Sequence, residues 1–452
     1  MSKCVRKGHL LTLFVFIFFS GRLLLAADTT GPASEPDLVL AIEKQDRILI
    51  FAPHPDDETI GAAGIIQKAL NIGAEVYVAC YTNGDANELS FIMYEKRLTF
   101  LKGEFVHMGE VRRKESISAL NFLGVDGGRI FFLGYPDLGT LPIMLKYWGK
   151  TKPYKSVFSR VRNVPYRENL SPDAPYCGES VLKDIKTVLL KTKPTKIFVS
   201  HPIDTNGDHQ SLYLFLQVSL WDLEGKIKRP DMYPYLVHSI GWPRPRGFHP
   251  DLELLMPKDF IDNKILWQRS DLTSEETQKK YDALQLYKSQ IPYNPHYLAT
   301  FARKNELFGG CPEVVLKDDK KAIELDWQNI DSKGFLSYEK RGDMLYIKLS
   351  LDRAITKAVA TSINLLGYSK KRPFSGMPKL RLVITRNRLT AYDKRNKVFI
   401  NDAEMDVVKD SIIVKFPLVA LNSPDYILAR VKANTRSMPT ASIGWRIVKI
   451  LK

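Results

Sequence analysis

Short apolar runs alternate with segments of helical periodicity over the first half of the chain. Runs of β character occupy residues 47–52, 75–81, 129–133 and 196–200, and helical spacing of apolar positions occupies residues 57–71, 103–122, 179–191 and 210–223. Buried strands that alternate with helices are typical of a parallel sheet covered by helices on both faces. The pattern therefore predicts an α/β fold built on a mostly parallel sheet.

The alternation lapses between residues 141 and 177, where lysine, tyrosine and proline are frequent. A stretch of this length without periodicity predicts an insertion, which we place near the rim of an active site. Helical patterns return at residues 274–289 and 298–308. We expect these two segments to be the last helices of the α/β domain.

Beyond Gly309 and Gly310 the pattern changes to short β-type runs separated by turn residues. The clearest of these runs cover residues 345–349, 379–384, 411–416 and 426–431. Such spacing predicts a smaller antiparallel, sandwich-like all-β domain. We therefore expect an α/β domain over residues 41–309 and a β domain over residues 310–452, which serves either as an accessory for a glycan or partner or as a purely structural unit.

The N-terminal residues resemble an export signal. A basic start precedes an apolar run at residues 10–19, which is too short to span a bilayer of roughly 20 apolar residues. We expect a signal peptide over residues 1–27 and a polar linker over residues 28–40, hence a periplasmic or extracellular protein. The alternative is a signal that stays uncleaved and anchors the chain in the membrane.

The charge of the chain is strongly basic. Its 452 residues include 66 lysines and arginines against 50 aspartates and glutamates, a formal net charge of +16. These cations are spread along the sequence without the basic and aromatic pattern of a nucleic-acid module, so we expect no nucleic-acid partner. An anionic envelope or polysaccharide fits the charge better.

Three cysteines follow the N-terminal segment, and their spacing is not that of a metal site. Cys80 lies in an apolar run, which predicts a thiol in the core. In an oxidising compartment Cys177 and Cys311 could pair, and the sequence leaves that disulfide open.

The first chemical motif follows the first predicted strand. Residues 53–58 read Pro-His-Pro-Asp-Asp-Glu, which puts an imidazole and three carboxylates where a strand turns into a helix. Ligands of open α/β sheets bind at this edge, and hydrolytic zinc sites use His and carboxylate ligands with one position left for water. His54 and Asp57 are therefore candidate ligands, with Asp56 as a general base.

The second motif follows the fourth predicted strand, at the same edge of the sheet. Here five polar residues with ligand or proton-transfer chemistry occur within nine positions: His201, Asp204, Asn206, Asp208 and His209. His209 would start a helix and complete a His, Asp, His zinc set. Asp204 or Asp208 would orient an imidazole from behind.

Together these residues resemble the PIG-L/LmbE family of zinc deacetylases. The hallmark of the first turn is matched by residues 53–58, and the His-Pro-Asp-His hallmark of the second by Asn-Gly-Asp-His at residues 206–209. Weaker echoes are Thr-Asn-Gly-Asp at residues 82–85, Gly-Tyr-Pro-Asp at 134–137, Tyr-Leu-Val-His at 235–238, and Arg112 and Glu115. The resemblance covers about residues 47–308.

The resemblance implies a Rossmann-like fold that hydrolyses an N-acetyl group, often on an N-acetylglucosamine unit of a glycan or glycoconjugate. It implies Zn²⁺ as cofactor, held by His54, Asp57 and His209, with Asp56 as base. Weaker candidates are the substrate contacts, which the resemblance and position suggest at Arg112, Asp137 and His238.

One position departs from the family. The family has histidine, which helps to stabilise the oxyanion, where this chain has Asn206. An asparagine amide can donate a hydrogen bond but cannot transfer a proton at neutral pH. Loss of such a group costs on the order of 10²–10³ in rate, so we expect His201 or His238 to supply the acid.

Two other functions share this motif set. One is an amide hydrolase for a thiol conjugate or another non-sugar amide, which would use the same metal ligands. The other is a catalytically impaired glycan-binding protein, which Asn206 favours and the retained His54, Asp57 and His209 oppose. Iron or another divalent ion could replace zinc at such ligands.

Overall fold

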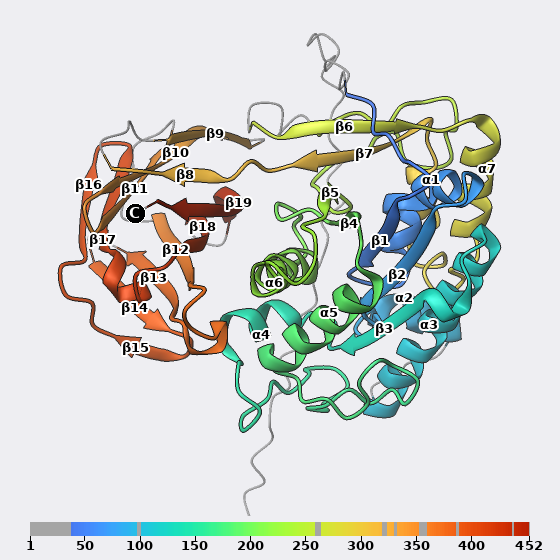
Figure 1. Cartoon of the computed structure of the whole chain (residues 1–452), viewed down its shortest axis with the longest axis horizontal. Coiled ribbons are helices and arrows are strands. Elements are labelled where there is room, and N and C mark those ends of the chain that lie inside the picture. The colour runs from blue at the N-terminus through green and yellow to red at the C-terminus, as the bar shows by residue number, and fades with distance from the viewer. Residues whose placement is uncertain are drawn as a thin grey trace, which may run out of the picture. The chain divides into compact units, whose positions relative to one another are not determined.

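Five parallel strands form the centre of the α/β region in the computed structural model of the chain (Figure 1). The structure describes residues 38–96, 101–257, 264–318, 323–329, 332–351, 359–385, 388–435 and 438–451. The parallel strands are β1 (Arg47–Ala52), β2 (Glu75–Thr82), β3 (Ile130–Tyr135), β4 (Lys196–Ser200) and β5 (Asp231–Tyr235). Two antiparallel strands, β6 (Leu266–Asp271) and β7 (Asn305–Gly310), complete a sheet of order β3-β2-β1-β4-β5-β7-β6.

Helices cover both faces of this sheet. Alternate residues of β1 enter different cores: Ile48 and Ile50 join the core that includes α1 (Asp57–Asn71), α3 (Lys102–Leu123) and α7 (Ser274–Leu284). Leu49 and Phe51 instead join the core that includes α5 (Gly178–Thr192) and α6 (Gly207–Asp222). Side chains of a strand point alternately to its two faces, so the predicted α/β fold with a mostly parallel sheet is confirmed.

The prediction of a helix over residues 298–308 is wrong. Only a 3₁₀ turn forms, at Leu298–Phe301, and β7 follows it. β7 is buried along almost its whole length and pairs with β6, and the bare backbone of Gly309 faces Trp267, where a Cβ would come within 2.7 Å of the indole. Burial on both faces removes the alternation that would mark a strand in sequence.

Other elements had no sequence signal that we recognised: β5, β6, α2 (Glu88–Glu95) and α4 (Thr140–Lys146). α4 lies within the stretch predicted as an irregular insertion; the chain from residue 147 to residue 177 contains no further helix or strand. The start of the predicted insertion is therefore helical, and the rest of it, residues 147–177, is irregular as predicted.

A buried ion pair supports the helix that follows β1. α1 is kinked at Ala62, whose φ of −146° interrupts the helix. Glu306 on β7 accepts hydrogen bonds from the N–H groups of Gly64 and Ile65, at 2.8 and 3.1 Å. Lys280 pairs with Glu306 at 2.7 Å and donates to the carbonyl of Ile60. These partners satisfy backbone groups that the kink frees.

The C-terminal region consists of two β-sheets around a common core. One sheet has the order β16-β17-β11-β10-β9 and the other β15-β14-β13-β12-β18-β19-β8; all pairings are antiparallel except that of β19 with β8. The bounds are β8 (Val314–Leu316), β9 (Ile323–Asn329), β10 (Ser332–Arg341), β11 (Met344–Leu351), β12 (Val359–Tyr368), β13 (Lys379–Thr385), β14 (Arg388–Asp393), β15 (Asn396–Val398), β16 (Glu404–Val408), β17 (Ser411–Pro417), β18 (Tyr426–Thr435) and β19 (Met438–Ile450). The predicted all-β region is confirmed.

This β region contacts the start of α6. Arg430 on β18 and Trp445 on β19 both donate to the side-chain oxygen of Gln210, at 2.8 and 3.2 Å. The backbone N–H of Trp445 donates to the carbonyl of Pro202. The C-terminal strands therefore support the second motif directly, which gives them a structural role.

The three cysteines among the described residues are free. Cys80 is buried in the core as expected, Cys177 lies 3.3 Å from the hydroxyl of Ser180, and Cys311 lies 3.7 Å from the ring of His201. The disulfide that the sequence left open is therefore not formed.

The export prediction concerns residues 1–27 and most of the linker, and these lie outside the described residues. Within the described ranges, no helix combines the length and the apolar character that a membrane span requires.

Candidate metal centre

The turn after β1 is held in an unusual backbone conformation. Asp56 has a φ of 125°, which L-residues rarely adopt, and α1 begins at the next residue. The buried carboxylate of Glu58 accepts the N–H of Asp56 at 3.1 Å, and the carbonyl of Pro53 accepts the N–H of Thr82 at 3.0 Å. Strain of this kind persists only where surrounding contacts enforce it, and it occurs preferentially at functional sites.

The turn after β4 is built around the start of α6. The side-chain oxygen of Asn206 accepts the N–H of Asp208 at 2.8 Å, which is the geometry of an N-cap. His209 follows in the first turn of α6 and is fully buried. Ser200, the last residue of β4, donates to the carbonyl of His209 at 2.8 Å. The cap and this bond fix the direction of the imidazole.

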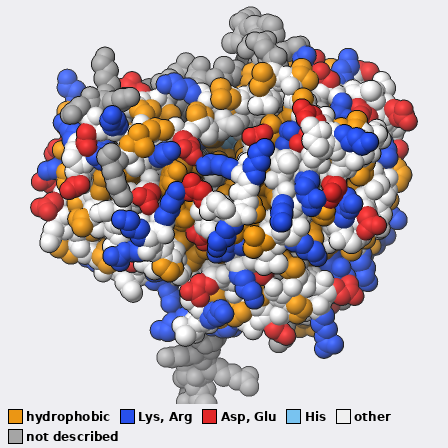
Figure 2. Space-filling view, viewed as in Figure 1, with side chains coloured by type: hydrophobic (Ala, Val, Ile, Leu, Met, Phe, Trp, Pro, Cys, Tyr) orange, Lys and Arg blue, Asp and Glu red, His pale blue; other side chains and the backbone are white. Residues whose placement is uncertain are grey.

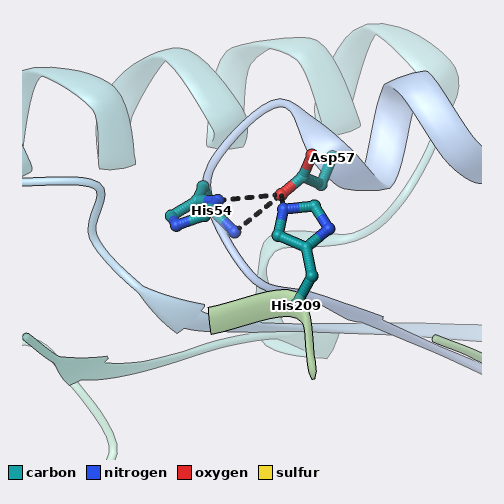
Figure 3. A group of neighbouring side chains, drawn as sticks. All are labelled: His54, Asp57 and His209. Atoms are coloured by element: carbon teal, nitrogen blue, oxygen red, sulfur yellow. Dashed lines mark hydrogen bonds and ion pairs between the residues drawn. The ribbon is translucent and has the colours of Figure 1, made fainter. Parts of the chain in front are cut away.

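The two turns bring His54, Asp57 and His209 together (Figure 3). Nδ1 of His54 and Nε2 of His209 each lie 3.1 Å from the same oxygen of Asp57. One ligand atom from each residue lies within 4.8 Å of the others, and all three residues are buried. The ligand set that the sequence predicted therefore occupies one place in the structure, at the carboxyl edge of the sheet.

The geometry around His209 fits a cation between these groups. Both ring nitrogens are buried, yet neither has a partner aligned for a hydrogen bond among the described residues. The Asp57 oxygen is near enough to Nε2 but in an unfavourable direction. Buried polar atoms are rarely left without a partner, and a divalent ion bound by imidazole and carboxylate would supply one.

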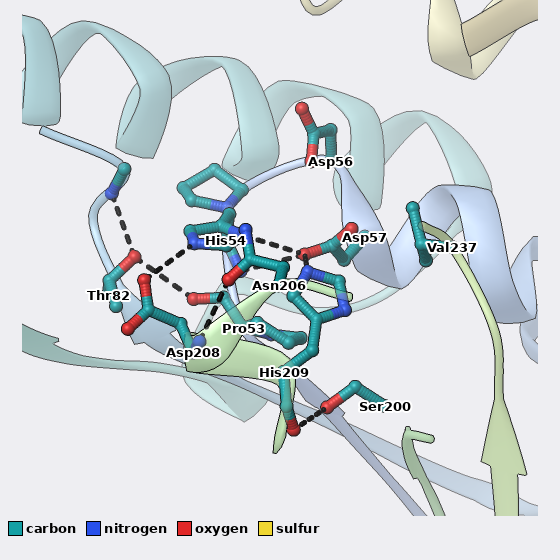
Figure 4. A network of polar contacts seen from close by, with 12 residues as sticks. Pro53, His54, Asp56, Asp57, Thr82, Ser200, Asn206, Asp208, His209 and Val237 are labelled. Atoms are coloured by element: carbon teal, nitrogen blue, oxygen red, sulfur yellow. Dashed lines mark hydrogen bonds and ion pairs between the residues drawn. The ribbon is translucent and has the colours of Figure 1, made fainter. Parts of the chain in front are cut away.

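Two aspartates, Asp204 and Asp208, stand behind the histidines, and Figure 4 labels the second of them. An oxygen of Asp204 lies 3.2 Å from Nδ1 of His209, and an oxygen of Asp208 lies 3.3 Å from Nε2 of His54. A carboxylate on the far nitrogen of a metal-binding imidazole fixes its tautomer and orientation. The sequence left open which aspartate does this, and in the structure each of them faces one histidine.

Two other groups of side chains have comparable spacing: Asp204, His209 and His238, and His54, Asp137 and Asp208. Their carboxylates are already used as acceptors. Asp208 accepts the N–H groups of Leu138 and Thr140, and Asp204 accepts those of Val237 and His238. Asp57 also accepts a backbone N–H, that of His54 at 3.0 Å, but only its group joins a histidine from each of the two motifs, and for that reason it is the better candidate for an ion.

The charges at this site are strongly coupled. Burial acts to raise the pKa of Asp57, but His209 and His54 together hold it well below its usual range. Burial acts to lower the pKa of His209, but Asp204 and Asp57 raise it to about 9. In the absence of a metal, protonated histidines balance the negative charge of the carboxylates. A bound divalent cation can supply that positive charge instead.

Asp56 belongs to a separate pair. In Figure 4 its side chain lies apart from His54, Asp57 and His209. Arg112 on α3 donates to Asp56 at 3.0 Å and to the carbonyls of Pro55 and Gly84 at 2.8 and 3.0 Å. Burial raises the pKa of Asp56 to about 8, against the opposing charge of Arg112. Arg112, predicted as a substrate contact, thus holds the backbone and carboxylate of the first turn.

Asp137, predicted as a substrate contact, also faces a residue of the candidate metal centre. It is almost fully buried, with one oxygen 3.2 Å from Nε2 of His54 and the other accepting the N–H of Ala86 at 3.1 Å. Its neighbour Asp85 accepts the N–H of Asp137 at 3.2 Å. Asp137 therefore acts on His54 in this structure.

The two histidines suggested as acids lie in different surroundings. His201 is buried, stacks on Trp267 and accepts the N–H of Ile203 at 3.1 Å; burial and Arg446 lower its pKa to about 3. It is therefore the neutral imidazole at neutral pH rather than the imidazolium that would serve as an acid. His238 is partly exposed, lies edge-on to His209 with 4.6 Å between ring centroids, and has an Asp204 oxygen 3.2 Å from its Nδ1. Of the two, only His238 is placed for proton transfer at the site.

Glu58 has a role that the sequence did not reveal, although it stands in the motif. It is fully buried and accepts hydrogen bonds from Ser116 at 2.5 Å and from Tyr287 at 2.8 Å, in addition to the N–H of Asp56. Ser116 and Tyr287 come from distant α3 and the segment after α7, so no local pattern marks them. Glu58 therefore connects two distant segments to the strained turn.

A model of the PIG-L family, described as GlcNAc-PI de-N-acetylase, matches residues 49–218. The chain is also similar to a probable N-acetylglucosaminyl-phosphatidylinositol de-N-acetylase of Dictyostelium discoideum, with 30% identity over 86 residues. That match covers 19% of this chain and spans about a quarter (26%) of the relative.

Two solved structures illustrate more distant likenesses. N,N'-diacetylchitobiose deacetylase from Pyrococcus horikoshii is 20% identical, with a TM-score of 0.35 over 58% of this chain and 82% of that one. A 4-carboxy-2-hydroxymuconate hydratase from Pseudomonas putida is 15% identical, with a TM-score of 0.33 over 61% of this chain and 99% of that one. These likenesses are too remote to bear on the reaction.

The family match includes both turns, from the end of β1 to the middle of α6, and hence all three residues of the candidate metal centre. It leaves the β region outside. On this match, which bears out the resemblance found in the motifs, residues 49–218 form a domain of the PIG-L family.

Proposed function

We propose that this chain is a metal-dependent N-deacetylase that removes an acetyl group from an amino sugar of a glycan or glycoconjugate. The PIG-L match supports this reaction class, because the description of that family names a de-N-acetylase of an N-acetylglucosamine compound. The Dictyostelium relative carries the same kind of name. Zinc is the proposed ion, since two imidazoles and one carboxylate with an open position suit it.

The observation that carries the proposal is the buried ring of His209. It lies beside Asp57 and His54 without an aligned partner for either nitrogen. A purely structural histidine in such a core would be hydrogen-bonded. Bound to these three ligands, zinc would supply Lewis acidity that polarises an amide carbonyl and makes water acidic near neutral pH.

Asp56 is the proposed base. Its raised pKa suits a group that takes a proton from water near neutral pH. Arg112 keeps one carboxylate oxygen in place at 3.0 Å. The positive φ of Asp56 turns its side chain to a different side from that of Asp57. Adjacent aspartates can therefore have separate duties, one as ligand and one as base.

Asn206 and His238 are the proposed groups for the oxyanion and the leaving amine. The oxygen of Asn206 caps α6, which leaves its amide NH₂ as the group that can donate to a developing negative charge. His238 is the partly exposed imidazole beside His209, and an Asp204 oxygen lies 3.2 Å from its Nδ1. The amide donates without transferring a proton, and the imidazole transfers one.

The test is acetate release from N-acetylglucosamine oligomers by the purified chain, with and without a chelator. The proposal expects release that a chelator abolishes and that zinc restores. Exposed Asp251, changed to Asn, is a matched control for changes at the buried aspartates. Bound metal without acetate release from any amino sugar would favour the other-amide or binding-protein functions, the second of which Asn206 motivates.

Export to the periplasm or the extracellular space remains our proposal for the location. It rests on the basic start and short apolar run of residues 1–27. Fusion of these residues to a reporter that is active only outside the cytoplasm tests it. An inactive reporter would remove the reason to expect an envelope glycan as substrate.

A further inference from the structure

A groove of about 300 Å³ lies at the end of α4 that is remote from Asp208. Four separate segments line it: the end of α4 with the residues after it, the start of α5, and two loops of the β region. Its lining residues are Lys146, Tyr147, Trp148, Gly149, Thr151, Lys152, Glu179, Ser375, Gly376, Lys394 and Arg395. We call it the basic groove.

The basic groove gathers like charges. Lys146, Lys152, Lys394 and Arg395 face it together with a single carboxylate, that of Glu179. Within the described part of the chain, none of these four cations forms an ion pair. Elsewhere on the surface lysines and arginines are interspersed with acidic side chains, as Figure 2 shows for one face. A concave site of one charge sign concentrates ions of the opposite sign.

Aromatic rings line the same groove and continue beyond it. The guanidinium of Arg395 lies 4.9 Å from the centroid of the Tyr147 ring. Tyr147 in turn contacts Tyr154 edge-on, with 5.3 Å between ring centroids. Tyr154 packs on Gly139, where a Cβ would approach its ring to 2.6 Å. Ligand sites combine such apolar ring surfaces with a few placed polar groups.

α4 links the basic groove to the metal centre. Its first residue, Thr140, donates its N–H to Asp208, and Asp208 faces His54. Its last residue, Lys146, lines the groove. Seven helical residues span about 10 Å, so the groove and the contact with Asp208 lie at the two ends of one short helix.

The end of a helix carries partial negative charge that would repel an anion. Here several carbonyls at this end have donors of their own. The carbonyl of Met144 accepts the indole N–H of Trp148 at 2.8 Å, and that of Tyr147, the residue after α4, accepts the N–H of Gly178 at 2.8 Å. These bonds reduce the negative charge that the cations of the groove oppose.

We propose that the basic groove binds an anionic substituent on a glycan substrate, on a sugar unit away from the one that is deacetylated. The cations would hold a carboxylate or phosphate group, and the partly exposed ring of Tyr147 would contact the sugar. This rests on the proposed function for the choice of a glycan. It also gives the β region a part in substrate choice, because Lys394 and Arg395 belong to it.

Binding is measured by titration calorimetry, without any need for turnover. The probes are tetragalacturonate, which carries carboxylates, an oligomer of glycerol phosphate, and neutral chitotetraose. The groove variant is Lys152→Gln with Arg395→Gln. The matched control is Lys228→Gln with Lys409→Gln, which removes the same charge at exposed positions outside the groove. A Tyr147→Ala variant tests the ring.

The proposal expects an anionic probe to bind more tightly than chitotetraose and to bind about tenfold more weakly to the groove variant, with the control within twofold. The probe that shows the loss identifies carboxylate or phosphate as the bound group. Equal losses in both variants, no binding of either anionic probe, or groove-dependent binding of phosphatidylglycerol vesicles alone would overturn it. Absence of acetate release would contradict the proposed function, but it would not affect the measured binding of the anionic probes to the groove.

Discussion

The metal centre and the basic groove lie at opposite ends of α4 and are built on opposite principles. At the metal centre the charged groups are buried, and each carboxylate has several partners. At the groove four cations are without ion pairs among the described residues and face solvent. Buried charges must be positioned accurately to be tolerated, whereas exposed charges act together through their field. Single substitutions should therefore change activity or zinc binding strongly at the metal centre. At the basic groove they should change substrate binding only weakly.

The largest effect is expected at Asp56. Asp56→Asn removes the proposed base while leaving His54, Asp57 and His209 intact, so acetate release should fall by about 10²–10⁴-fold. Bound metal should stay at the level of the unchanged chain, as measured by elemental analysis. Asp251→Asn should change neither value. If the Asp56 variant kept more than about a tenth of the activity, another group would have to be the base.

The next effect is expected at Asp204, whose oxygens face His209 and His238. Asp204→Asn should weaken zinc binding by about 10–100-fold, because it removes the carboxylate that orients a ligand. Competition with a chelating dye measures this change. The exposed Asp173, changed to Asn, is the control. Unchanged affinity in the Asp204 variant would mean that the orientation of His209 depends on the α6 cap alone.

A smaller change in zinc affinity is expected when the pH is varied. Against burial, Asp204 and Asp57 raise the pKa of His209 to about 9 in the metal-free chain, so this imidazole is protonated at neutral pH. A metal needs it neutral. Zinc affinity should therefore rise with pH up to about 9 and fall by up to about tenfold for each unit of acidification below it. Titrations at several pH values in matched ionic strength measure this slope, and a flat profile would contradict the assignment of His209 as ligand.

The smallest effect is expected where the two sites meet. Lys152→Gln with Arg395→Gln should leave acetate release from neutral chitotetraose within about twofold, because exposed charges contribute little without an opposite charge on the ligand. For an acidic oligosaccharide the same pair should raise KM and leave kcat nearly unchanged. An equal loss with the neutral oligomer would show that the groove acts on the fold of the metal centre instead.

The same contrast explains what could be predicted from the sequence. His54 and Asp57 are three residues apart after β1, and His209 stands in the first turn of the helix that follows the neighbouring strand β4, so sheet topology brings them to the same edge. The strands and helices that carry them were predicted to within a few residues. Local pattern and global fold agree in that part of the chain.

What could not be predicted depends on distant contacts. The basic groove joins Lys152 to Arg395, which lie far apart in the sequence and meet only through packing of α4 on the β region. β7 was taken for a helix because both its faces are buried. Arg112 and Asp137 were assigned to substrate, and only the structure shows that they contact Asp56 and His54. His201 has the right chemistry but stacks on Trp267.

The most direct test of the account is the metal content of the purified chain after exposure to zinc and removal of unbound ion, compared with that of His209→Ala. The account predicts about one zinc ion per unchanged chain, held at three protein ligands, and far less in the variant, with both proteins folded by circular dichroism. No retained zinc in the unchanged chain, or the same amount in both proteins, would contradict the assignment of His54, Asp57 and His209 as the metal centre.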